Sequence, residues 1–160
     1  MLAVDVPIHR PFYKAAMKSD VFFLGGGNTF YFLHHLRQSR VMHDLIKAAN
    51  DGKVIAGMSA GSILMTPSIQ MAGVPKFDRD VNEYNLKNLN SMNLVDFEFF
   101  PHYRDLKKYN DVFCSHTKDS ALPLFAAADG GGIVVCGNKK IFIKNPPMFL
   151  NGKRHQHPNN

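Results

Sequence analysis

Residues 21–29, VFFLGGGNT, and residues 54–62, VIAGMSAGS, decide the fold of this chain. In each stretch a short apolar run breaks off at glycines and small polar residues, which is typical of a buried strand ending in a tight turn. Between them, residues 29–50 carry apolar side chains at helical spacing (positions 30, 33, 36, 41, 45 and 46), and residues 50–52, NDG, close the segment. This order of strand, helix and strand predicts an α/β fold with a parallel sheet.

Further short apolar runs continue the pattern toward the end of the chain, at residues 97–100, 122–126, 133–136 and 141–143. The sequence CGNK at residues 136–139 is typical of a hairpin turn, so we expect the mostly parallel sheet to finish with an antiparallel hairpin. No repeat or linker divides the chain. We therefore predict one domain over residues 1–160, with a flexible tail at residues 154–160.

The composition indicates a folded protein that works in a reducing compartment. The chain has 160 residues, 45% of them apolar and 20% charged, and only two cysteines. No run approaches the roughly 18 apolar residues of a membrane span, and the first residues lack the pattern of a secretory signal. We expect a cytoplasmic protein with no membrane partner. The net charge of +6 comes from dispersed lysines and arginines, which argues against nucleic-acid binding.

The pentapeptide around Ser59 is the strongest candidate for chemistry. Residues 57–61, GMSAG, match the G-x-S-x-G pattern and lie between an expected strand and an expected helix. In that setting small neighbours permit a sharp turn that presents the serine hydroxyl as a nucleophile. A turn without chemistry and an anion-binding turn both remain open, because short motifs recur by chance.

A glycine loop, Gly25-Gly26-Gly27, ends the first strand and could bring backbone N–H groups close to a ligand. Those groups could hold a phosphate or form an oxyanion hole, and a simple tight turn is the alternative. A dinucleotide-binding motif fails because its third glycine would fall at Phe30, and no Walker loop is present.

A serine nucleophile needs a histidine base, and position favours His102 among eight histidines. His102 follows the apolar run 97–100, and ligands of open α/β sheets bind at the carboxyl ends of strands. His116 lies near Cys114 without the spacing of a metal site, so we expect no metal and no cofactor.

The acid that would orient the histidine is not fixed by the residues alone. The polar stretch between Ser59 and His102 contains four candidates: Asp78, Asp80, Glu83 and Asp96.

Taken in order, FFLGGGNTF, GMSAGS and FFPHY resemble the dipeptidase E family of serine peptidases, which includes the cyanophycinases. The resemblance implies a three-layer, flavodoxin-like sandwich similar to class I glutamine amidotransferases. It also implies a serine exopeptidase with a Ser-His-acid triad that releases N-terminal aspartate from short peptides. A cyanophycinase-like hydrolase of aspartyl polymers and an inactive homologue acting as a binding or scaffold protein are the alternatives.

The resemblance also implies residue roles. Ser59 would be the nucleophile, His102 the base and Asp80 the acid, with Asp78 and Glu83 as alternatives. Gly27 and Ala60 would form the oxyanion hole.

Asn28 and Lys118 would contact the substrate, Lys118 standing where the family carries an arginine. A lysine keeps the charge of that arginine but lacks its bidentate fork, so the preference for aspartate would be weaker.

Family members also carry further strands ahead of the glycine loop, so we expect the first strands of the sheet to be missing here. An unpaired edge beside the glycine-loop strand would follow, and we expect it to favour a homodimer.

Overall fold

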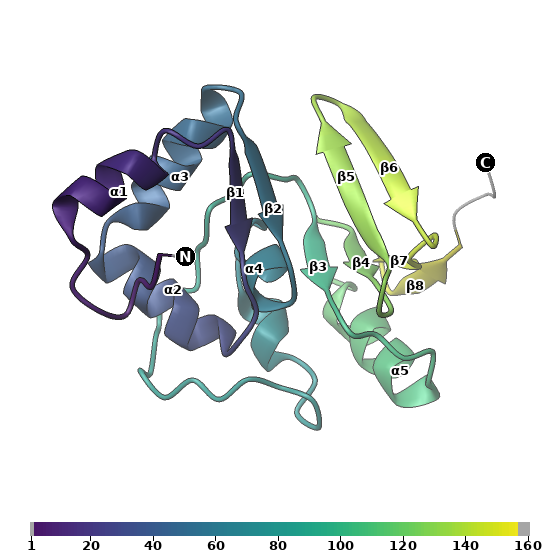
Figure 1. Ribbon diagram of the computed structural model, residues 1–160. Helices are drawn as coiled ribbons and strands as arrows, with labels where there is room; N and C mark the ends of the chain where they lie inside the picture. Colours follow the sequence, from purple (N-terminus) through teal and green to yellow (C-terminus); the bar gives the residue numbers. More distant parts are fainter. Residues whose placement is uncertain (1, 157–160) are drawn as a thin grey trace.

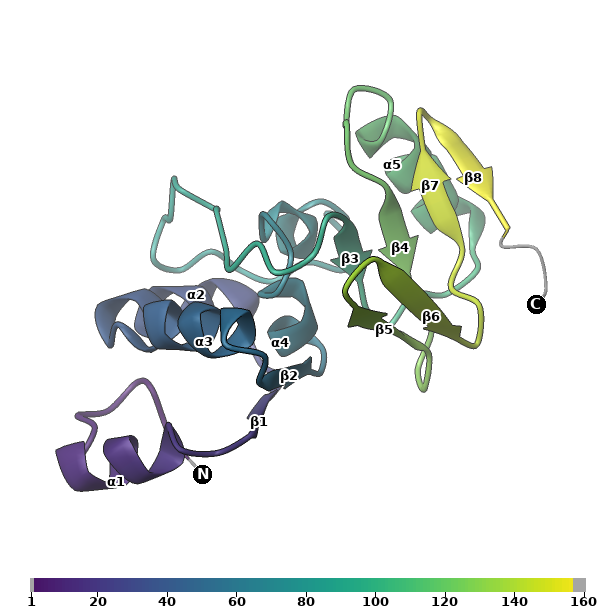
Figure 2. The same cartoon turned by 90° about the horizontal axis from the view of Figure 1, so that it is seen from above.

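A computed structural model describes residues 2–156 of the chain. In the N-terminal half, two parallel strands pair in register from Val21 opposite Val54 to Leu24 opposite Gly57. Helices α2 and α3 connect them and cover one face, as Figures 1 and 2 show. The elements of this half are α1 (Arg10–Ala16), β1 (Val21–Leu24), α2 (Thr29–Gln38), α3 (Val41–Asn50), β2 (Val54–Gly57), α4 (Ala60–Ile63) and the 3₁₀-helix η1 (Gln70–Gly73).

The amphipathic pattern of residues 29–50 accounts for the packing of this half. Leu33, Leu36 and Leu45 point inward and are at most 3% exposed, in one cluster with Leu24 and Leu64. The opposite face of the two strands is open, because Val21, Phe23 and Val54 each expose more than half of their surface. Among residues 2–156, helices therefore cover this small sheet mainly on one side.

The C-terminal half contains a second sheet in the order β3-β4-β7-β8 and a separate hairpin, β5-β6. β3 and β4 are parallel, and the remaining neighbours are antiparallel. The elements are β3 (Glu98–Phe100), α5 (Lys107–His116), β4 (Leu124–Ala126), β5 (Gly132–Cys136), β6 (Lys139–Ile143), β7 (Met148–Leu150) and β8 (Lys153–His155).

Strand alternation divides the core of the second sheet between its two faces. Phe100, Leu124 and Phe149 pack with Phe113 of α5 on one face. Neighbouring residues in the sequence face the other way and pack with side chains of the β5-β6 hairpin. This second cluster consists of Phe97, Phe99, Phe125 and Ala127, with the partly buried Ile133, Phe142 and Met148 packed against it. The sheet is thus enclosed by a helix and a hairpin.

The predicted α/β class, with parallel strands and an antiparallel hairpin at residues 136–139, is confirmed. The structure differs in dividing the strands of residues 2–156 among three sheets, because β2 does not pair with β3 and the β5-β6 hairpin pairs with neither of the other sheets. It differs also at the expected tail, where Lys153–His155 forms β8 against β7 around the turn at Asn151 and Gly152. Residues 157–160 of that tail lie outside the described residues.

Candidate active site

Ser59 lies on a sharp turn between β2 and α4. Its backbone has φ 53° and ψ −119°, a conformation that residues with a side chain rarely adopt. Such angles are typical of strained turns that present a functional side chain, and they fit the strand–turn–helix context of the G-x-S-x-G pattern.

Close backbone packing explains the small residues around Ser59. A Cβ atom at Gly57 would lie 2.4 Å from the carbonyl oxygen of Gly61, and one at Gly61 would lie 2.2 Å from that of Leu24. The amide of Gly61 also donates to the carbonyl of Gly25 at 3.0 Å. Any side chain at these two positions would push β1, β2 and α4 apart, so the glycines are required sterically.

The structure brings Ser59 together with His102 and an acid. Ser59 Oγ lies 3.0 Å from Nε2 of His102, and Nδ1 of the same ring lies 2.6 Å from Oδ1 of Asp129. His102 follows β3 with a positive φ of 57°, and Asp129 follows β4. Because β3 and β4 are parallel neighbours, their carboxyl ends deliver both side chains to the same edge. The side chains of His102 and Asp129 are 57% and 84% exposed.

The acid beside His102 is thus Asp129 rather than Asp80, the residue expected there. Asp80 Oδ2 instead accepts the backbone N–H of Thr29 at 2.7 Å, and its own amide donates to Ala72 at 2.9 Å. The loop that carries Asp80 runs along the N-terminal half, so this carboxylate fixes the start of α2.

The alternative acids also lie elsewhere. Asp78 Oδ2 accepts the hydroxyl of Tyr109 at 2.5 Å, and Asp96 pairs with Lys140 at 2.8 Å. The exposed Glu83 lies in a turn of the same loop as Asp80. Among residues 2–156, Asp129 is the carboxylate in hydrogen-bond contact with His102.

One signal for Asp129 is present in the sequence. Residues 126–132, AAADGGG, place an acidic residue directly after an apolar strand and before three glycines. That is the position that favoured His102 after its own strand. The family resemblance instead implied an acid in the stretch between Ser59 and His102.

The backbone amides expected to form an oxyanion hole flank the serine. Gly27 ends the glycine loop with a φ of 126°, which favours glycine. Ala60 is the first residue of α4, so its N–H lacks a partner within the helix. The loop lies close to the serine, since a Cβ at Gly26 would be 3.4 Å from Cβ of Ser59.

The two residues expected to bind substrate lie in structural positions. Asn28 caps α2, because its Oδ1 accepts the amide of Tyr31 at 2.9 Å while its Nδ2 donates to the carbonyl of Val81 at 2.8 Å. Lys118 follows α5, and its side chain lies against the turn at Gly152 between β7 and β8. Lys118 does not line the cavity beside Ser59.

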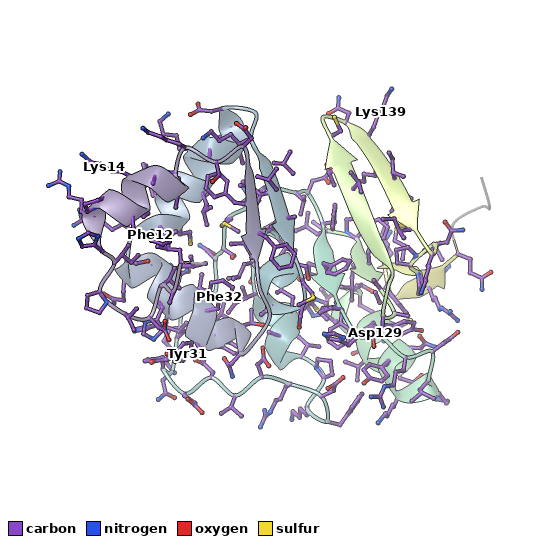
Figure 3. All side chains as sticks on the ribbon, viewed as in Figure 1. Phe12, Lys14, Tyr31, Phe32, Asp129 and Lys139 are labelled. Carbon is purple, nitrogen blue, oxygen red and sulfur yellow. The ribbon has the colours of Figure 1, made fainter. Side chains whose placement is uncertain are left out.

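Lys144 is a cation that the structure does place next to the candidate acid. Its Nζ donates to the backbone carbonyl of Asp129 at 3.0 Å. Figure 3 shows Asp129 on the loop at the base of the β5-β6 hairpin, far from Lys139 at the hairpin tip.

A cavity of about 960 Å³ opens beside Ser59, His102 and Asp129. Most of its lining is apolar, and it includes residues of β2, β3 and the β5-β6 hairpin. Residues 2–156 contain no group of three or more histidine, cysteine or acidic side chains that could hold a metal ion. Within that same range, no helix has the length and apolar character needed to cross a membrane.

The turn that carries His102 is anchored by its neighbour Tyr103. The Tyr103 hydroxyl lies 2.7 Å from Oδ1 of Asn110 and 3.0 Å from Oδ1 of Asp105. Burial, aided by the hydrogen bond to the Asp105 carboxylate, raises the pKa of Tyr103 to about 12. The phenol is therefore neutral at ordinary pH and holds the segment after β3 in place.

The fold and site define an α/β protein with a serine, a histidine and a carboxylate in contact at the carboxyl ends of its strands. The family model of peptidase family S51 matches residues 7–143. The chain belongs to this family, which confirms the resemblance drawn from its motifs.

Individual relatives agree with the family. An "uncharacterized peptidase" of Listeria monocytogenes is 34% identical over 55% of this chain and 42% of its own length. Peptidase E of Shewanella denitrificans is 33% identical over 91% of this chain and 63% of its own length. Peptidase E of a Nostoc species is 31% identical over 57% of this chain and 35% of its own length. The matched segments thus span between about one third and two thirds of these relatives.

The crystal structure of a protein assigned to peptidase E from Listeria monocytogenes superposes with a TM-score of 0.70. It is 24% identical, and the match covers 88% of this chain and 67% of that one. At this identity the superposition supports the fold.

Proposed function

We propose that this chain is a serine exopeptidase that hydrolyses short peptides through Ser59, His102 and Asp129. The observation that carries the proposal is the pair of contacts on the His102 ring, to Ser59 Oγ at 3.0 Å and to Asp129 Oδ1 at 2.6 Å. Membership of peptidase family S51 supports peptide bonds as the target.

The mechanism follows from the two ring nitrogens of His102. Its Nδ1–H donates to Asp129, which fixes the tautomer that leaves Nε2 free to accept the Ser59 proton. Ser59 Oγ then attacks the peptide carbonyl carbon, and the oxyanion accepts hydrogen bonds from the amides of Gly27 and Ala60. As the C–N bond breaks, His102 returns the proton to the leaving amine. Water hydrolyses the resulting acyl-enzyme in the same way.

A preference for N-terminal aspartate is part of the proposal. Such a preference needs a cation near the site, and Lys118 lies outside the cavity lining. Lys144 is not among the lining residues either, but its ammonium contacts the backbone carbonyl of Asp129 and has further hydrogens to donate, so it is the better candidate. A lysine attracts a carboxylate as a point charge, so we expect a moderate preference.

The test compares Asp-Leu with Ala-Leu and a β-linked Asp-Arg dipeptide as substrates of the wild-type chain. We expect Asp-Leu to be cleaved fastest and Ser59→Ala to abolish turnover. A reactive serine probe, read by mass spectrometry, should label Ser59 alone. Cleavage of the β-linked peptide only would favour the cyanophycinase-like alternative. Absence of both labelling and turnover in folded protein would favour the inactive homologue.

The homodimer expected from an unpaired strand edge stays a prediction. β1 pairs with β2 on one side, and its side chains Val21 and Phe23 are 57% and 65% exposed. A second copy covering this surface would remove apolar area from water.

A further inference from the structure

The cavity beside Ser59 extends well beyond the reacting groups. Ser59, His102 and Asp129 line one end, while Lys53 and Val54 at the start of β2 line the other, near the hairpin turn at Gly137. The four residues of β2 alone extend about 10 Å at the usual rise of a strand. A volume of about 960 Å³ is at the upper end of small-ligand pockets and exceeds what one side chain fills.

Two unpaired strand edges border this cleft. β2 pairs with β1 alone and β3 pairs with β4 alone among the described residues. Residues of both strands line the cleft, including Ile55 of β2 and Phe99 of β3. An unpaired edge presents backbone N–H and C=O groups that an extended peptide can pair with.

The side chains along the cleft are apolar and exposed. Val54 and Met58 are 55% and 56% exposed, and Ile143 and Val135 are 46% and 37% exposed. Apolar side chains gathered around a hollow favour an apolar occupant, because filling it removes their surface from water.

The lining offers no free charge to a charged occupant. Among the described residues, the acidic and basic side chains of the lining are Lys53, His102 and Asp129. Lys53 Nζ donates to the carbonyls of Met17 and Ser19 at 2.8 and 2.9 Å, and Asp129 is held by His102. A charged side chain buried here would lose water without gaining a partner.

We propose that this cleft binds an extended, apolar segment of the peptide substrate on the leaving side of the scissile bond. Preferred substrates are then longer than dipeptides, with the scissile bond at Ser59 and apolar residues running along β2. Hydrolysis of these longer peptides rests on the proposed peptidase function. Their binding rests on the cleft alone.

Binding is tested separately from hydrolysis with the Ser59→Ala variant. Two dye-labelled pentapeptides, Asp-Leu-Val-Leu-Val and Asp-Ser-Asn-Ser-Asn, are titrated by fluorescence anisotropy. We expect the apolar peptide to bind at least about tenfold more tightly, the discrimination that apolar pockets achieve for small changes in a ligand. The wild-type chain should show a higher kcat/KM for the apolar pentapeptide than for Asp-Leu.

The β5 strand provides a matched pair of variants. Val135 lines the cleft, whereas the adjacent Val134 points to the opposite face and is similarly exposed at 48%. In the Ser59→Ala background, Val135→Asn should weaken binding of the apolar pentapeptide about tenfold. Val134→Asn should leave that affinity unchanged.

Three results would overturn the proposal: equal affinity for the two pentapeptides, equal effects of the two valine variants, or a dimer in light scattering that Val135→Asn alone dissociates. The last result would assign the cleft to a second copy. If Ser59 is unreactive but the apolar peptide still binds selectively, the proposed hydrolysis fails while the cleft assignment stands.

Discussion

The two sides of the site are built in opposite ways. Ser59 is placed by backbone packing, since a Cβ at Gly57 or Gly61 would overlap carbonyl groups. His102 and Asp129 are placed by exposed loops that follow β3 and β4, and their side chains are 57% and 84% exposed. The comparison teaches that the position of Ser59, the proposed nucleophile, depends on a rigid contact between β1, β2 and α4. The positions of His102 and Asp129, the proposed base and acid, depend on how two neighbouring strands end.

Gly61→Ala tests the rigid contact between β1, β2 and α4 most directly. The added Cβ would lie 2.2 Å from the carbonyl oxygen of Leu24 and 2.7 Å from that of Gly25. Because both contacts are to backbone, we expect the free energy of unfolding to fall by about 3 kcal/mol, measured by urea denaturation. Gly25→Ala is the control, since nothing lies within 4 Å of its Cβ. Equal losses of unfolding free energy in the two variants would show that the close contact between Gly61 and β1 does not stabilise the turn at Ser59.

On the exposed side, Asp129→Asn tests the acid. Without the carboxylate, the imidazolium that forms during attack loses its partner, so we expect kcat for Asp-Leu to fall about a hundredfold with little change in KM. Asp80→Asn is the matched comparison. It should keep kcat within a few fold but lower the free energy of unfolding by about 1 kcal/mol, because a charge-assisted hydrogen bond to Thr29 weakens. A larger loss of kcat in Asp80→Asn would restore Asp80 as the acid.

The smallest expected effect concerns the anchor of the His102 loop. The pKa of Tyr103 is raised to about 12, above the value of about 10 for an unfolded chain. The stabilisation tied to this shift is therefore complete below about pH 10 and is lost as the pH rises toward about 12. We expect the free energy of unfolding of Tyr103→Phe to fall less steeply than that of the wild type across this interval. Parallel slopes in urea denaturation would show that the phenol does not titrate as described.

The sequence predicted the elements whose causes are local. The glycines flanking Ser59 are visible in the motif because steric overlap between adjacent segments demands them. The turn before Lys139 and the helices between β1 and β2 likewise follow from short-range patterns. His102 could be proposed as the base from the sequence because it follows a recognisable strand, and that role stays a prediction.

The features that escaped prediction depend on distant contacts. Asp129 and His102 are 27 positions apart in the sequence. They come into contact only because β3 and β4 are neighbouring strands. The separation of β2 from β3 has no local signature, and the cleft between them was therefore not expected. The long loop that carries Asp80 packs on the start of α2. The polar composition of this loop does not indicate which part of the fold it contacts.

The backbone of Ser59 has a consequence for the evolution of such chains. At φ 53° and ψ −119°, a glycine would relieve the local strain, whereas serine retains the strain together with the hydroxyl that the proposed hydrolysis requires. Without selection for hydrolysis, substitution of Ser59 by glycine would thus be favoured, because it would raise stability while removing the hydroxyl. A serine that persists in lineages of this chain would mark continued use of the site.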